Sequence, residues 1–299
     1  MVIQNIYKSN TITFARALLA LCFLSTLLFT PIYDLFPVQH IEQLKNSSNS
    51  SLNLNIYLLF NNIEIPYCIS IIVLLFVISG FYPRLSCLFQ TWISYSIFYS
   101  MLVTDGGDQI NIILTFLLLP ICLLDNRKNG WNVDFNEKTS NRFLLYNASI
   151  AIIFIQFQMA VLYFNAGVAK MFQPEWLNGS AVYYWFNDPT FGAPYWVKSC
   201  VGFLFENDYT ITIINWSVMI LEVALFVGFF LKQKYKYLLF VLAFIFHFLI
   251  FIVHGLPSFV ISMSAGLVLF YFQLDKTITE NFISMRLSII EILKHEKRD

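Results

Sequence analysis

The residues of this chain that could do chemistry are polar side chains set inside long apolar runs. Gln156, Tyr163 and Lys170 are spaced seven residues apart, and on a helix that spacing drifts by only about 20° per heptad. The three side chains therefore share one stripe that ends at Lys170. A partly desolvated lysine can act as a base, so we predict Lys170 and Tyr163 as catalytic residues. A lysine that only reaches toward lipid headgroups is the alternative.

A second polar group lies in two later runs. Glu222 follows Ile211 by eleven residues, which places it roughly 16 Å along a helix at about 1.5 Å per residue. His247 follows Tyr237 by ten residues. Because the connection at 232–236 is short, the two runs are expected to be antiparallel neighbours. We therefore predict that Glu222 and His247 lie at one level and pair, by a hydrogen bond or an ion pair.

Two further polar residues lie in apolar runs. His254 follows His247 by seven residues on the same predicted face. Two histidines on one stripe can relay protons, so His254 is a third predicted catalytic residue, with hydrogen bonding inside the bundle as the alternative. Arg16, in the first run, is expected to pair within the bundle or with headgroups at the inner surface.

The turn Asp105-Gly-Gly-Asp108, followed by Gln109, is a candidate substrate-binding site. Its glycines permit a tight turn, and two carboxylates could hold a cation or receive Lys170. A solvated turn without a ligand is the simpler alternative. No metal site is predicted, and the sequence contains no Walker loop, H-E-x-x-H or G-x-S-x-G motif.

The composition determines the kind of fold that must position these residues. Of the 299 residues, 58% are hydrophobic and 12% are charged, against roughly 25% charged in soluble domains. Such a chain cannot build a water-facing surface, so we predict an all-α integral membrane protein. Eight runs approach the length needed to cross about 30 Å of hydrocarbon: 13–30, 65–82, 85–103, 110–124, 143–167, 211–231, 237–253 and 257–273.

The orientation follows from the basic residues, which are retained on the cytoplasmic side of a membrane. With eight helices and both termini inside, fourteen of the eighteen Lys and Arg residues fall inside, only Lys45, Lys170 and Lys198 fall outside, and Arg16 lies in the first run near the inner face. We predict a transmembrane domain over residues 1–275 in the bacterial cell membrane. Residues 276–299 are predicted to form a cytoplasmic amphipathic tail on the inner membrane surface, with a solvated, frayed tail as the alternative.

The segment from Lys170 to Tyr209 falls on the outer face and is rich in aromatic residues with interspersed Gly and Pro. This composition suits interfacial or re-entrant structure that lines a cavity, with Trp176 as a candidate substrate-binding residue. An ordinary aromatic belt is the alternative. Cys68 and Cys200 also fall near the outer face, where a disulfide could form in an oxidising compartment.

Several motifs resemble those of a known family. Tyr163-Phe-Asn-Ala-Gly-Val-Ala-Lys170, followed by Trp176-Leu-Asn-Gly179, resembles the signature of the HTTM (horizontally transferred transmembrane) family, which is related to vitamin K-dependent gamma-carboxylases. Arg16, Asp105-Gly-Gly-Asp-Gln109 and Pro120-Ile-Cys-Leu-Leu-Asp125 are similar to its sporulation-delaying protein B branch.

The resemblance implies a bacterial membrane protein that matures a secreted antimicrobial peptide toxin from its precursor, together with the A protein of the same system. In the carboxylases the matching lysine is the base that works with reduced vitamin K, so Lys170 would do chemistry at an outward-facing site. A membrane quinone is the cofactor that the resemblance suggests. Only a short tail follows Gln273, whereas the carboxylases hold their protein substrate through a large lumenal domain, so carboxylation is not carried over.

Three functions therefore stay open. A membrane-embedded peptide-modifying enzyme is the first. A non-catalytic chaperone or export component for the peptide is the second, and a self-protection factor against it is the third. No nucleic-acid partner is predicted.

Overall fold

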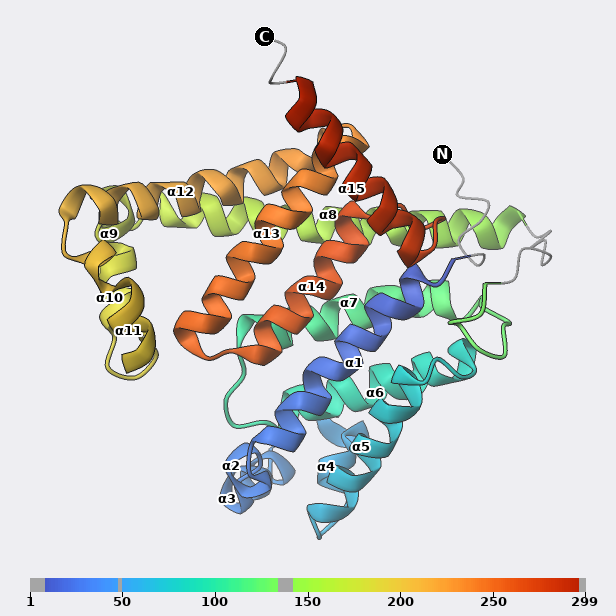
Figure 1. Ribbon diagram of the computed structural model, residues 1–299. Coiled ribbons are helices and arrows are strands. Elements are labelled where there is room, and N and C mark those ends of the chain that lie inside the picture. The colour runs from blue at the N-terminus through green and yellow to red at the C-terminus, as the bar shows by residue number, and fades with distance from the viewer. Residues whose placement is uncertain (1–8, 48–49, 134–141, 296–299) are drawn as a thin grey trace. The chain divides into compact units, whose positions relative to one another are not determined.

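The computed structural model describes residues 9–47, 50–133 and 142–295, and Figure 1 shows their elements. Over these residues the regular structure is helical, and no strand occurs. The prediction of an all-α chain is therefore confirmed. Of the basic residues used to orient the chain, Lys8, Lys138, Lys297 and Arg298 lie outside the described residues.

A helix occupies each of the eight predicted apolar runs. These helices are α1 (Thr11–Phe29), α5 (Glu64–Ile78), α6 (Pro83–Ser100), α7 (Gly106–Cys122), α8 (Arg142–Lys170), α12 (Asp208–Val227), α13 (Gln233–His254) and α14 (Pro257–Tyr271). Four helices are long and apolar enough to cross a membrane: α1, α8 from Leu145, α12 with its extension to Phe230, and α13. The chain is thus a membrane protein, while the predicted count of eight membrane spans is not confirmed.

Shorter helices connect the long ones. On the N-terminal side they are α2 (Ile32–Leu35), α3 (Val38–Lys45), the 3-10 helix η2 (Ser50–Leu54) and α4 (Ile56–Leu59). Between α8 and α12 lie α9 (Pro174–Leu177), α10 (Ala181–Asn187), α11 (Tyr195–Val201) and the 3-10 helix η3 (Gly202–Phe205). The 3-10 helix η4 (Gly228–Phe230) extends α12, and α15 (Ile278–His295) lies in the predicted tail.

The chain forms two compact units. The first contains residues 1–155, 257–269 and 273–282, and the second contains 156–256, 270–272 and 283–299. Both α8 and α14 therefore contribute to both units. The predicted boundary between a membrane domain and a tail at residue 275 stays a prediction.

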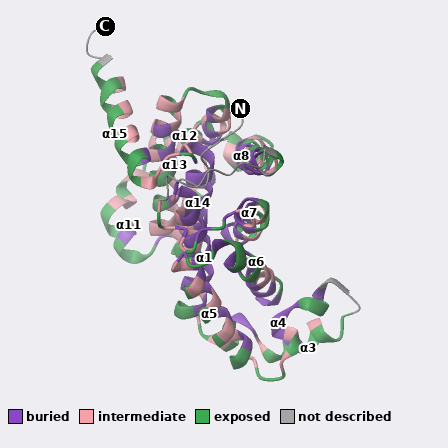
Figure 2. Cartoon of the chain, turned by 90° about the vertical axis from the view of Figure 1, so that its right-hand side faces the viewer, coloured by how far each residue is buried: buried purple, intermediate pink, exposed green. Residues whose placement is uncertain are grey.

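The core of the first unit lies between α1, α5 and α6. Phe23, Leu27, Leu74 and Ile97 are among its fully buried side chains. Figure 2 shows buried and exposed residues on different sides of α7, as expected for a helix that packs on one face. Large apolar side chains on the outer faces, such as Ile72, are exposed. This distribution suits a lipid environment, which does not require a polar outer surface.

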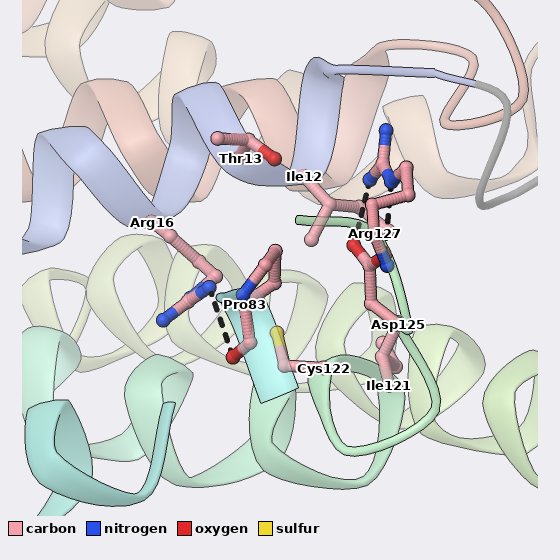
Figure 3. A pocket seen from close by; sticks show the side chains of 8 residues that line it. All are labelled: Ile12, Thr13, Arg16, Pro83, Ile121, Cys122, Asp125 and Arg127. Atoms are coloured by element: carbon pink, nitrogen blue, oxygen red, sulfur yellow. Dashed lines mark hydrogen bonds and ion pairs between the residues drawn. The ribbon is translucent and has the colours of Figure 1, made fainter. Parts of the chain in front are cut away.

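Arg16 pairs within the first unit, as predicted. Its guanidinium is buried and donates to Oε1 of Gln90 (3.1 Å) and to Oγ of Ser86 (3.0 Å). Arg16 lines a cavity of about 10 Å³. Beside this cavity lies an ion pair in which Nη2 of Arg127 is 2.7 Å from Oδ2 of Asp125. Figure 3 shows both groups, and the cavity has room for about one water molecule. The arginine thus holds α1 against α6.

The five cysteines are free thiols. Cys68 and Cys200, the two considered for a disulfide, are both exposed.

Candidate functional site

Lys170 and Glu222 form an ion pair in the second unit. Nζ of Lys170, the last residue of α8, lies 2.7 Å from both carboxylate oxygens of Glu222 in α12. It also donates to the carbonyl oxygen of Ala166, over 3.2 Å. The Glu222 side chain is 7% exposed and the Lys170 side chain 22% exposed. Because an unpaired charge in an apolar bundle is costly, each group makes the burial of the other tolerable.

The two residues meet because buried stripes on α8 and α12 face each other. On α12, buried residues recur every three or four positions: Ile211, Asn215, Met219, Glu222 and Leu225. On α8, buried Met159 and Tyr163 continue the stripe toward Gly167, which packs against Val223. The glycine has no side chain to separate the helices. Lys170 therefore follows one turn later within reach of the carboxylate.

Trp176 covers the lysine. Its ring centroid lies 5.1 Å from Nζ of Lys170, within the range of a cation–π interaction. The predicted binding residue Trp176 and the predicted catalytic residue Lys170 are thus brought together, and Glu222 joins them.

Asn215 holds the Trp176 segment on α12. Its Nδ2 donates to the carbonyl oxygen of Trp176 (2.8 Å), and its Oδ1 accepts from the amide of Val182 (3.4 Å). Asn215 is fully buried. The sequence analysis missed this residue, although it precedes Glu222 by seven residues and so shares its helix face.

A second polar pair joins α8 to α13. The hydroxyl of Tyr163 lies 2.9 Å from Nε2 of His247, and both side chains are buried. The structure therefore gives Glu222 and His247 other hydrogen-bonding partners than the predicted ones, because Glu222 binds Lys170 and His247 binds Tyr163. The prediction compared depths along α12 and α13 only, and depth does not determine which helix a side chain faces. The stripe of α8 supplies both partners.

His254 tethers the end of α13. Its Nδ1 lies 2.6 Å from the carbonyl oxygen of Phe191, so this nitrogen carries the donated proton. Its ring also meets the ring of Trp185 edge to face, at a centroid distance of 6.2 Å. The residue thus connects α13 to the segment that holds α10 and α11. The predicted catalytic role of His254 stays a prediction.

The Asp105 turn begins α7 in the first unit. Oδ1 of Asp105 accepts from the amide of Asp108 (2.9 Å), and Oδ2 of Asp108 accepts from the amide of Asp105 (3.0 Å), which is a reciprocal capping box. Asp105 also accepts from the hydroxyl of Ser258 (3.2 Å). The backbone amide of Gln109 donates to the backbone carbonyl oxygen of Asp105 (3.3 Å). Both carboxylates thus stabilise the start of the helix.

Gly107 lets α7 approach α14. A β-carbon there would lie 2.7 Å from Cα of Phe259, so only glycine fits this contact without a shift. Substrate binding at Asp105, Asp108 and Gln109 stays a prediction, as does a cavity shared with Lys170.

Among the described residues, no group of three or more His, Cys, Asp or Glu side chains is arranged to hold a metal ion.

Comparisons with known proteins cover most of this chain. The HTTM domain matches residues 8–274, a range that contains every residue of the site. Sporulation-delaying protein SdpB of Bacillus subtilis (strain 168) is 34% identical over 226 residues, which are 75% of this chain and 68% of that protein. The uncharacterized protein YitO of the same organism is 33% identical over 282 residues, or 92% of this chain and 89% of that protein. No solved structure matches.

Proposed function

This chain belongs to the HTTM family, and we propose that it takes part in the production of a secreted peptide toxin, through chemistry at the Lys170–Glu222 pair. The similarity to a sporulation-delaying protein supports the biological role. The observation that carries the chemical role is the ion pair itself. A lysine and a glutamate are placed at the end of an apolar helix, where well-packed apolar residues would give equal or greater stability.

The proposed step is a proton transfer. Glu222 takes the ammonium proton along the 2.7 Å hydrogen bond and leaves Lys170 as a neutral amine. The amine then takes a proton from one atom of the precursor peptide and becomes an ammonium group again, and the protonated Glu222 gives its proton to another atom of that peptide, which returns the pair to its starting state. Trp176 shields the amine on one side, and Tyr163 with His247 supplies a second polar pair deeper in the same unit. The quinone suggested by the resemblance stays an expectation.

The proposed setting is the bacterial cell membrane, with both termini in the cytoplasm. In that orientation the outer end of α8 carries Lys170 to the surface where an exported peptide emerges. The proposed partners are the toxin precursor and the A protein of the same system. Basic residues where α13 begins (Lys232 just before the helix, and Lys234 and Lys236 in its first turn) support this orientation.

The test is the mass of the secreted peptide in cells that carry Lys170→Met or Lys170→Arg. Arginine keeps the charge but cannot become a neutral base. Both variants are expected to insert into the membrane and to yield no mature peptide. Lys198→Met, which removes another predicted outer lysine, is the matched control and is expected to leave the peptide unchanged. Unchanged peptide from both Lys170 variants would overturn the catalytic role, and a lower yield of peptide with the normal mass would favour a chaperone.

A further inference from the structure

The residues between α8 and α12 form a folded cap on the second unit. We call residues 174–205, which contain α9, α10, α11 and η3, the aromatic cap. Its own core contains buried Phe186, Ala193 and Val197, and the ring of Phe186 stacks on that of Phe205 with centroids 3.8 Å apart. Ile252 and Val253 of α13 pack against this core. The exposed side chains of the cap are therefore displayed on a fixed scaffold.

The cap is joined to three helices that are long enough to cross a membrane. It begins after Lys170 at the end of α8 and leads into Asp208 at the start of α12. The hydrogen bond from His254 to Phe191 attaches it to the last turn of α13. These three helix ends must lie at one surface of a membrane that the helices cross. In Figure 1, α10 and α11 run across the direction of α12, as helices lying along that surface would.

Many of the exposed side chains of the cap are aromatic. Six that are more than half exposed are Tyr184, Trp185, Phe191, Tyr195, Trp196 and Phe203. Between residues 181 and 205 the only charged side chains are Asp188 and Lys198. Figure 2 shows α11 with largely exposed residues. A surface that faced water alone would be an unfavourable place for so many rings, whereas Tyr and Trp are enriched where one side of a ring is apolar and the other is wet.

We propose that the aromatic cap lies in the headgroup region of the outer leaflet, with α10 and α11 along the membrane surface and their exposed rings in contact with lipid. A re-entrant loop would bury these rings within protein, and they are exposed. The attachment of the cap to three spanning helices places it at interfacial depth, which favours lipid over a soluble protein as the partner. This inference does not depend on chemistry at Lys170.

The test measures the depth of spin labels in vesicles of phosphatidylcholine and phosphatidylglycerol. The full chain with Cys68→Ser and Cys200→Ser receives a nitroxide at Tyr184→Cys or Tyr195→Cys, both exposed positions that should tolerate replacement. Asn53→Cys, at an exposed polar position of η2 before α4, is the control for water. Ile220→Cys, which is 64% exposed in the middle of α12, is the control for hydrocarbon.

Collisions with oxygen, which concentrates in lipid, and with a water-soluble nickel chelate report the depth. Both cap positions are expected to show nickel access several-fold below that of Asn53→Cys and above that of Ile220→Cys. Nickel access equal to that of Asn53→Cys would overturn the proposal and leave the surface to a peptide or protein partner. Access as low as that of Ile220→Cys, or no access for either reagent, would overturn it as well.

A second measurement uses the unlabelled chain. Lipids brominated near the headgroup should quench its tryptophan fluorescence more than lipids brominated at the chain end, and Trp185→Phe with Trp196→Phe should remove most of that difference. A difference that survives these two substitutions would count against the cap as its source.

Discussion

A β-carbon added to Gly167 of α8 would lie 3.1 Å from Cγ2 of Val223 in α12. The same carbon would lie 3.4 Å from Cβ of Glu222. The distance between the two helices at this level is therefore determined by the absence of a side chain. The same distance determines whether Lys170, one helical turn later, reaches the carboxylate of Glu222.

Enlarging Gly167 should separate the helices and break the ion pair. Alanine requires a shift of a few tenths of an ångström and should be tolerated, whereas Gly167→Leu should cost about 2 kcal/mol, the usual range for overpacking. The measurements are thermal unfolding in detergent and the yield of mature peptide. Gly202→Leu is the matched control, because nothing lies within 4 Å of a β-carbon at Gly202. Equal behaviour of the two leucine variants would contradict this role of Gly167.

Asn215 should prove to be a positioning residue for Trp176. Asn215→Ala removes the donor to the Trp176 carbonyl and the acceptor of the Val182 amide, two partly buried backbone groups, at a cost of roughly 1–3 kcal/mol. The emission of Trp176 should change at the same time, relative to a Trp176→Phe reference. Asn187→Ala is the control, since Asn187 also donates to a backbone carbonyl but is exposed; its effect should stay within about 0.5 kcal/mol. A similar loss in both variants would argue against a special role for Asn215.

The helices were predictable from sequence because apolar runs of this length have few alternatives in a membrane. Their ends were less predictable. The run expected over 65–82 ends as a helix at Ile78, since Gly80 and Tyr82 both have positive φ, at 74° and 44°. Gly80 packs against Trp131, where a β-carbon would lie too close to the indole ring. That contact depends on a residue far away in the sequence, which the local pattern does not contain.

The sequence allowed the depth of each site residue along its helix to be predicted, but not the neighbouring helix that its side chain faces. A spacing of seven residues grouped Tyr163 and Lys170 on one stripe of α8, and the two side chains contact His247 and Glu222. Depth alone, however, paired Glu222 with His247, because the rotation of α12 and α13 relative to α8 depends on packing. Asn215 could have been found by applying the same seven-residue spacing backward from Glu222.

Acidification should loosen the turn between α10 and α11. The backbone amides of Phe191 and Thr190 each donate a hydrogen bond of 2.8 Å to Oδ1 of Asp188. These two hydrogen bonds lower the pKa of this carboxyl below its usual value. A carboxyl with a lowered pKa stabilises the fold above its unfolded pKa of about 3.9, and the stabilisation is lost as the pH falls through the lower native value. Asp188→Asn keeps the acceptor oxygen but does not titrate. For each of the amides of Thr190 and Phe191, the hydrogen-exchange rate in the wild type divided by the rate in Asp188→Asn should therefore rise below about pH 4. A ratio that stays constant with pH would refute the prediction.

Removing one member of the Lys170–Glu222 pair should destabilise the chain more than removing both. Lys170→Met or Glu222→Met alone leaves an unpaired charge in the bundle. The cost is about 3 kcal/mol, the lower end of the range for broken buried pairs, because the lysine is 22% exposed. The double variant replaces both charges with apolar side chains, and its thermal stability in detergent should return close to that of the wild type.

The same three variants separate stability from chemistry. If the pair acts on the precursor peptide, the double variant should be folded and stable and still yield no mature peptide, because neither a base nor its proton acceptor is present. Recovery of the mature peptide together with stability would mean that the pair only holds α8 against α12. Glu222→Gln gives a further distinction, since its amide oxygen still accepts a hydrogen bond from Lys170 but cannot take the proton. It should therefore keep more stability than Glu222→Met and lose as much mature peptide.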